Sequence, residues 1–362
     1  MRVVLLAAAG LLVLTGSSAA GPPSQHTLRK NASGPIAAIA QDGSSVAWLS
    51  SSAQGCDAVH VLAPGTPDQV FPTQSSSSMT CHWNLTDGQP QLAIASRISM
   101  ALWTLHESGP APFDYVLAAR FDGTETKIDR IAHASDGTGS WLGGVAGSGR
   151  FLAYSWAEDE YKDKLGCLSG GSCARIVTGG EIDIVTPTEA RPLVKTPALQ
   201  LAASAGRIAY VPATRVPANR PAAGTNSPIY VVDAGTGQPV FPNNPTVAGV
   251  PAAIALSPHV LAVLTQKGPR DRISWFSATS GEQIDSVLVS SRAAPQLAAS
   301  DKLIVYHVYR NLYGISTATG HIKLLGKMPQ NTVTVGPTLG KGQLVWAEDS
   351  GTSGRLRALA AG

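Results

Sequence analysis

A short β-strand motif recurs along the whole chain and constrains the fold more than any other feature of the sequence. Each copy is a run of β-forming residues, and the copies follow one another at intervals of 40 to 56 residues. Six of the seven copies carry an aromatic residue at the equivalent place: Trp48, Trp103, Tyr154, Tyr210, Tyr306 and Trp346, with Val263 in the remaining copy. Self-similarity at such a period predicts one structural unit that is used several times.

Two further segments accompany most copies of this motif. A strand of small residues that ends in a tight turn precedes it, as in IAAIAQDG (36–43), LQLAASAG (199–206) and PQLAASD (295–301). A β-branched strand follows it and breaks at a Gly-rich turn, as in IYVVDAGTGQPVF (229–241) and ISWFSATSGEQI (273–284). A phosphate-binding loop would need a helix after its glycines, but a further strand follows here. Gly237 is therefore predicted to form a hairpin corner with positive φ.

Each unit thus contains four strands, and a four-stranded unit of this length is the blade of a β-propeller. The sequence predicts an all-β, seven-bladed propeller with antiparallel blades. The last unit ends after one further strand, residues 354–359, and a spare strand, residues 25–30, precedes the first unit. We expect these two strands to pair and close the ring, because an unpaired sheet edge invites aggregation. The recurrent aromatic residues are expected to pack between neighbouring blades.

The Gly-turn hairpins also resemble a known repeat. Segments 229–241, 273–287 and 312–325 are similar to the repeat of quinoprotein-type propellers, in which a β-run leads through Asp-Ala-x-Thr-Gly to a closing tryptophan. Phe241, Val287 and Leu325 stand near the place of that tryptophan. WD-repeat propellers look similar at this level. The resemblance implies a fold and does not carry quinone binding, so no cofactor is expected.

The N-terminal 20 residues are typical of an export signal. Arg2 precedes the apolar run Val3–Leu14, and small residues at 17–20 allow cleavage after Ala20. Twelve apolar residues are too few to span a bilayer, which takes about 20. We therefore expect residues 21–362 to form one propeller domain that a bacterium secretes or holds in its envelope. An uncleaved N-terminal anchor is the alternative.

Export makes the four cysteines interpretable, because disulfides persist in oxidising compartments. Cys167 and Cys173 enclose a short loop, which leaves Cys56 and Cys81 as the second pair. Metal ligation is the competing interpretation, but the sequence lacks the paired C-x-x-C spacing of a zinc site, so no metal is expected. The absence of a Lys/Arg run in a chain of net charge +3 also argues against a nucleic-acid partner.

One insertion concentrates charge in a chain of which only 14% is charged. It follows the aromatic strand of the third unit, and the residues chosen there as candidates for ligand binding are Trp156, Glu158, Asp159, Glu160 and Tyr161. A cation or a basic ligand would suit these carboxylates; a solvated acidic loop tip is the alternative. Arg215 and Arg220 in the next unit, and His82 and Trp83 in segment 72–90, complete the candidate set.

Propeller topology places these segments on one face. Loops between the second and third strands of a blade, and connections between blades, emerge on the same face, here called the loop face. The opposite face, which carries the tight turns, is called the turn face. The long insertions 50–57, 104–113, 157–178 and 212–228 and the connection 72–90 all belong to the loop face. Loops on a rigid scaffold commonly carry function, so a site is expected there.

No catalytic motif appears in the sequence, whether a G-x-S-x-G elbow, H-E-x-x-H or a calcium loop. We therefore expect a non-catalytic propeller that binds an extracellular or envelope protein, peptide or glycan. An enzyme of lyase or hydrolase type with its site at the mouth of the central channel is the first alternative, because residues from distant blades can converge there. A structural envelope component is the second.

Overall fold

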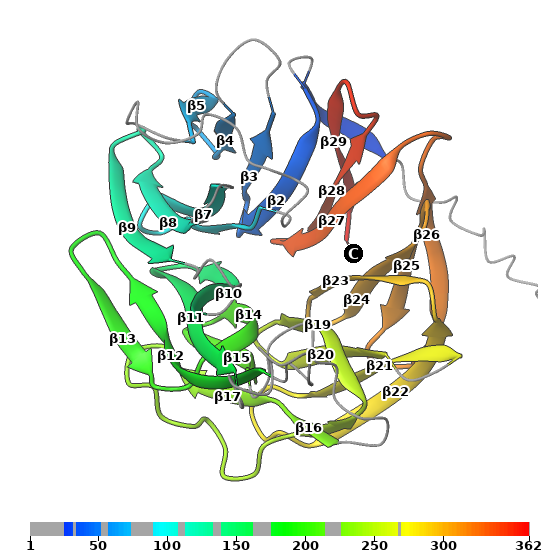
Figure 1. Ribbon diagram of the computed structural model, residues 1–362. Helices are drawn as coiled ribbons and strands as arrows, with labels where there is room; N and C mark the ends of the chain where they lie inside the picture. The colour runs from blue at the N-terminus through cyan, green and yellow to red at the C-terminus, as the bar shows by residue number, and fades with distance from the viewer. Residues whose placement is uncertain are drawn as a thin grey trace, which may run out of the picture.

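The computed structural model describes residues 25–31, 34–51, 57–73, 90–107, 113–132, 139–161, 175–213, 226–266 and 269–361. These residues form β-strands that are arranged as a ring of blades (Figure 1). Six blades are single four-stranded sheets, and one is divided into a three-stranded and a two-stranded sheet. The chain passes through the blades in sequence order, and each blade is antiparallel. The fold is a seven-bladed β-propeller, as predicted. The described residues include no helix that is long and apolar enough to cross a membrane.

The first three blades each have four strands in consecutive order. Blade 1 consists of β2 (Ile36–Asp42), β3 (Ser45–Ser50), β4 (Ala58–Leu62) and β5 (Gln69–Pro72). Blade 2 consists of β6 (Leu92–Ala95), β7 (Met100–Glu107), β8 (Phe113–Arg120) and β9 (Glu125–Ala132). Blade 3 consists of β10 (Gly139–Ser148), β11 (Phe151–Tyr161), β12 (Arg175–Val185) and β13 (Ala190–Val194). The first strand of each blade is the innermost.

Blades 5 to 7 repeat this order, and blade 7 borrows its outer strand from the N-terminal end. Blade 5 consists of β19 (Val250–Leu256), β20 (Val260–Gln266), β21 (Arg270–Ser277) and β22 (Gln283–Ser290). Blade 6 consists of β23 (Ala293–Ala299), β24 (Leu303–Val308), β25 (Asn311–Ser316) and β26 (Ile322–Lys327). Blade 7 consists of β27 (Val333–Gly340), β28 (Gln343–Asp349), β29 (Gly354–Ala360) and β1 (His26–Asn31).

The ring closes as the sequence predicted. Strand β1 pairs antiparallel with β29, from His26 opposite Ala358 to Asn31 opposite Gly354. Leu28 packs against the cluster of buried residues between blades 7 and 1. The first and last described strands therefore complete one blade, which removes two sheet edges that would otherwise be open.

Blade 4 departs from the regular pattern at its outer strand. Its sheet holds β14 (Ala198–Ser204), β15 (Arg207–Pro212) and β17 (Tyr230–Asp233), while β16 (Asn226–Pro228) pairs separately with β18 (Thr246–Ala248). The chain still follows the path of a fourth strand, because Val240 N donates to Val231 O and Ile229 N donates to Pro245 O. Prolines at 239, 242 and 245 supply no backbone N–H and so interrupt the ladder.

The recurrent aromatic residues pack between blades, as predicted. Trp103 of blade 2 lies in a buried cluster with Leu49 and Val59 of blade 1, and Trp346 of blade 7 lies in one with Val305 and Leu312 of blade 6. Each of the seven clusters found among the described residues joins two neighbouring blades. The hydrophobic core of the protein is therefore divided into interfaces between blades.

The Gly-turn hairpin at 229–241 is a corner between strands. Asp233 Oδ1 accepts hydrogen bonds from Gly235 N, Thr236 N and Thr236 Oγ1, and the bonds from Thr236 hold the pKa of this carboxyl below its ordinary value. Gly237 has a φ of 72°, and its N–H donates to Asp233 O at 2.8 Å. A side chain here would meet Leu193 O of blade 3 at 2.5 Å, so glycine also permits the close approach of two blades.

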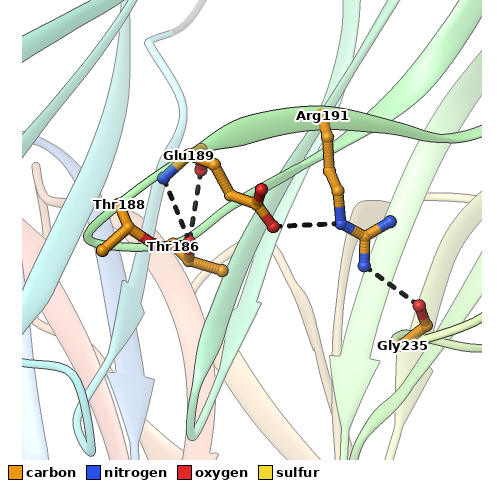
Figure 2. A network of polar contacts seen from close by, with 5 residues as sticks. All are labelled: Thr186, Thr188, Glu189, Arg191 and Gly235. Carbon is orange, nitrogen blue, oxygen red and sulfur yellow. Dashed lines mark hydrogen bonds and ion pairs between the residues drawn. The ribbon is translucent and has the colours of Figure 1, made fainter.

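Polar contacts on the turn face tie these corners to their neighbours. Figure 2 shows Arg191 of β13, whose Nε donates to Glu189 Oε1 at 3.2 Å while its Nη2 donates to Gly235 O at 3.0 Å. The guanidinium thus links the outer turn of blade 3 to the corner of blade 4. Glu189 N and O are both hydrogen-bonded to the hydroxyl of Thr186, which holds the turn that carries the glutamate.

Candidate functional site

The inner strands surround a central channel, and most of them carry a β-bulge at the equivalent position. Register shifts occur in β2, β10, β14, β19, β23 and β27, each at or shortly before the position opposite the recurrent aromatic site. The residues at and beside these bulges enclose a cavity of about 400 Å³ on the channel axis. All seven blades contribute to its wall, which consists of alanine, isoleucine, leucine, valine, proline, glycine, threonine and glutamine.

Glutamines from alternate blades are the most polar residues in this wall. Gln91 of blade 2 donates from Nε2 to Gly143 O at 2.8 Å and accepts from Val145 N at 3.0 Å, both in blade 3. Gln200 of blade 4 donates to Pro251 O of blade 5 at 3.2 Å. These side chains satisfy backbone groups that the bulges release from the strand ladder, so they join neighbouring blades at the axis.

A buried histidine contacts the third glutamine of the cavity wall, Gln296 of blade 6. His307 of β24 is 7% exposed; its Nε2 lies 3.0 Å from the side-chain amide of Gln296, and its Nδ1 donates to Tyr309 O at 3.2 Å. Burial lowers the pKa of His307, although the bond to Tyr309 opposes this effect. The neutral ring is therefore favoured. Its single N–H is donated by Nδ1 to Tyr309 O, so Nε2 acts as an acceptor and the Gln296 amide is oriented with its NH₂ group toward it.

Blade 3 extends farther toward the loop face than the other blades. β11 and β12 have 11 residues each, whereas the second strands of the other blades have six to eight. The extra residues are paired: Glu158 lies opposite Gly179, and Tyr161 opposite Arg175. β13 pairs with β12 only from Ile182 to Val185, so residues 175–181 project beyond the outer strand of the blade.

This extension changes the interpretation of the acidic segment. The sequence suggested an insertion or loop tip from Ala157 onward, but residues 157–161 form the end of β11. A β-bulge between Glu158 and Asp159, opposite Gly179 and Val177, lets the hairpin continue with altered twist. The prediction of a loop at these residues is wrong, because a second strand, β12, supplies hydrogen-bond partners that local sequence does not reveal.

The five candidate side chains of blade 3 do not converge on one point. Trp156 is partly buried against residues of blade 2 and donates from Nε1 to Asp183 Oδ2 at 3.1 Å. Glu158 and Glu160 are exposed, whereas Asp159 is 4% exposed. Tyr161 is half-buried at the end of the strand. The structure thus presents two glutamates to solvent on one side of a paired strand and buries the aspartate between them.

The remaining residues chosen from the sequence lie outside the described part of the chain. They are His82, Trp83, Arg215 and Arg220 of the candidate set and the cysteines Cys56, Cys81, Cys167 and Cys173. The two disulfide pairings therefore stay predictions.

The loop face also carries a pocket that the sequence did not indicate. It lies between blades 5 and 6, encloses about 540 Å³, and its wall includes Tyr306, Tyr313, Leu288 and Arg270. The rings of Tyr306 and Tyr313 are stacked at 5.4 Å, and burial raises the pKa of Tyr306 to about 12. From the sequence, Tyr306 was expected only to pack between blades. The cavity beside it depends on the outer strand of blade 5, whose position the sequence alone does not give.

No protein-family model matches the sequence, and no curated protein matches it. Several solved propeller structures are similar in fold. A catalytically inactive virginiamycin B lyase from Staphylococcus aureus, solved with quinupristin, superposes with a TM-score of 0.51 at 9% identity over 93% of this chain and 98% of that chain. An uncharacterized protein from Listeria monocytogenes gives 0.48 at 8% identity, over 91% and 93% of the two chains. Sqt1 from Saccharomyces cerevisiae gives 0.44 at 9%, over 93% and 100%.

The likeness to the lyase concerns the fold alone, because the two sequences are only 9% identical. The neighbours have varied roles, and a propeller scaffold does not define the chemistry of its sites. The structure confirms the propeller fold that the hairpin resemblance implied, and no family model supports the quinoprotein or WD repeat itself.

Proposed function

We propose that this protein is a secreted, non-catalytic propeller that binds a protein or peptide partner on its loop face, through the extended hairpin of blade 3. The observation that carries the proposal is the projection of β11 and β12 beyond the outer strand β13, while the inner strand β10 pairs with β11 as far as Asp159. A rigid, paired hairpin holds exposed side chains in fixed positions, which lowers the entropy lost when a partner binds.

The chemistry of the hairpin favours a basic, extended partner. Glu158 and Glu160 are exposed on one strand, and Ile176, at 39% exposure, lies opposite Glu160 on the other. The projecting part of β12, residues 175–181, can accept an added strand at its outer edge, since β13 ends its pairing at Ile182. Lysine or arginine side chains of that strand would then lie near the two glutamates.

The composition of the channel supports binding over catalysis. The described residues that line the cavity near the bulges carry no carboxylate, imidazole, thiol or ammonium group in its wall. Gln91 and Gln200 are engaged with backbone groups of the next blade, and Gln296 contacts His307 of its own blade. General acid–base catalysis needs a titratable group within hydrogen-bond reach of the substrate, so the alternative of a lyase or hydrolase at this part of the channel has less support.

Charge reversal on the hairpin tests this function. Peptides that bind the purified protein are selected from a random library, and their affinities are compared for the wild type and for E158K/E160K. The matched control is E282K/D285K, which reverses two exposed carboxylates of blade 5. We expect E158K/E160K to weaken the selected peptides at least tenfold and the control to leave them unchanged. Peptides that tolerate E158K/E160K would contradict the proposal.

A further inference from the structure

Basic residues recur in the turns that join the first and second strands of the blades. Six of the seven turns, or the residue that follows them, supply one: Arg97, Arg150, Arg207, His259, Lys302 and Lys341 in blades 2 to 7. These turns belong to the inner strands and therefore surround the channel on the turn face. In a chain with a net charge of only +3, this arrangement concentrates positive charge around one mouth of the channel.

A cavity of about 540 Å³ opens within this ring. Its wall is formed by turn residues of blades 1 to 5, and both Arg97 and Arg150 belong to it. Both arginines are exposed. Phe151, Ala205 and Pro258 supply an apolar part of the wall. Two guanidinium groups thus face one concave site that is large enough for a small ligand or for a group on a larger one.

Hydrogen bonds between blades hold these turns in place. Asp42 Oδ2 accepts from Ser96 N at 2.7 Å, from Ser96 Oγ at 2.6 Å and from Gly149 N at 2.9 Å, so one carboxylate joins blades 1, 2 and 3 next to both arginines. On the far side, Asp301 Oδ1 accepts from Ser257 Oγ at 2.7 Å and from His259 N at 3.0 Å. The guanidinium of Arg207 donates to the backbone oxygens of Pro258 and Ala278. The ring is therefore pre-organised.

The distribution of acidic residues restricts an anion to the mouth. Asp42 and Asp301 are the carboxylates of the inner turns, and each already accepts several hydrogen bonds. The outer turns of the same face carry further acidic residues: Asp122, Glu189, Asp233 and Glu282. A ligand with many negative charges would be attracted by the inner ring and repelled by the rim, so its position on the face is defined.

We propose that the turn-face mouth of the channel binds a phosphate-bearing polyanion, with Arg97 and Arg150 as the main contacts. A phosphate group offers three acceptor oxygens, so two guanidiniums can bind the same group, whereas a carboxylate is matched by one. Lys302 and Lys341 stand around the same mouth and attract successive phosphates of a chain. This site lies on the face opposite the extended hairpin and is independent of the function proposed above.

Isothermal titration of the full chain with short-chain inorganic polyphosphate tests the inference, with polyglutamate of equal charge as the competing polyanion. The variant R97Q/R150Q removes two charges from the mouth. The matched control R270Q/R292Q removes two exposed arginines from the loop-face side of blades 5 and 6. We expect polyphosphate to bind the wild type and the control alike and R97Q/R150Q at least tenfold more weakly, with an affinity that falls as salt is added.

Three outcomes would overturn the proposal. The first is no binding of polyphosphate to the wild type at low ionic strength, and the second is an equal loss of affinity in the control and in R97Q/R150Q. The third is polyglutamate binding as tightly as polyphosphate, which would assign the mouth to acidic peptides. Circular dichroism of both variants checks that they are folded, and Arg97→Lys, which keeps the charge but loses the planar fork, should show an intermediate affinity.

Discussion

Arg357 donates a hydrogen bond of 2.7 Å from Nη1 to Thr27 Oγ1, across 330 positions of sequence. The same guanidinium donates from Nε to Glu348 Oε1 at 3.1 Å, and Glu348 is 4% exposed. Three neighbouring strands of blade 7, β28, β29 and β1, are thus connected through one side chain. In Figure 1 the N-terminal strand lies beside the C-terminal strands, which is where the ring closes.

Removal of the closing strand should therefore destabilise the whole propeller. Deletion of residues 21–30 takes away most of β1 and exposes the outer edge of β29. We expect the free energy of unfolding to fall by several kcal/mol, because a strand ladder and the packing of Leu28 are lost. Deletion of residues 21–24 alone is the control. A melting temperature that stays equal in the two truncations would show that β1 does not close the ring.

Two buried tryptophans should differ in their sensitivity to the same substitution. Trp103 and Trp346 are both fully buried, and Trp103 Nε1 donates to Thr73 O of blade 1 at 3.0 Å. Trp346 Nε1 has no hydrogen-bond partner within the described part of the chain. We expect Trp103→Phe to cost about 1–3 kcal/mol more than Trp346→Phe, because only the former leaves a buried carbonyl without its donor. Urea denaturation of both variants measures the difference, and an equal cost would count against it.

Stability should decrease in mild acid because of a stacked histidine. The ring of His60 lies 4.8 Å from that of Trp48, nearly parallel to it, and burial lowers its pKa from 6.5 to about 4. Between these values the unfolded chain binds a proton that the folded protein does not. The free energy of unfolding should thus fall by at most about 3 kcal/mol as the pH drops from 6.5 to about 4.

His307, whose pKa is also lowered by burial, should add to this dependence in the same direction. The variant His60→Phe retains an aromatic ring for stacking on Trp48 and has no group that titrates. We expect it to show a shallower loss of stability over this pH interval than the wild type. An identical slope in the two proteins would assign the acid sensitivity to other groups.

The cysteines give a prediction that covalent chemistry can decide. From the sequence we predict that Cys56 pairs with Cys81 and that Cys167 pairs with Cys173. Closing a loop of the length between Cys56 and Cys81 stabilises a protein by about 3 kcal/mol in the chain-entropy treatment. Non-reducing peptide mapping should recover these two linkages. A 56–167 or 56–173 linkage, or four free thiols, would show that the assignment of these loops to the propeller is wrong.

The repeat was sufficient to predict the fold because each blade uses the same local rules. The aromatic positions gave the number and register of the blades, and Gly237 showed where the hairpin of blade 4 turns. The outer strand of blade 4 was not predicted as interrupted, although the prolines at 239, 242 and 245 are visible in the sequence. A proline breaks a strand ladder only where its backbone faces a paired strand, and the sequence alone does not show which side of this segment is paired.

The sites were harder to predict, because they arise from residues that lie far apart in the sequence. Arg97 and Arg150 belong to separate turns and meet only through the ring. The acidic segment of blade 3 was singled out by its charge, but its pairing with β12 depends on residues after a long insertion. The bulges of the inner strands have no common sequence signature: Gly143, Pro295 and Ala37 occupy them in different blades.

The central claim is that a partner binds the loop face at the extended hairpin of blade 3. Hydrogen–deuterium exchange with and without a selected peptide tests it most directly, because added-strand binding protects backbone amides. We predict that protection appears at residues 157–161 and 175–181 and that the inner turns around Asp42 and Gly149 are unchanged. Protection confined to those inner turns, or none at residues 175–181, would contradict the claim.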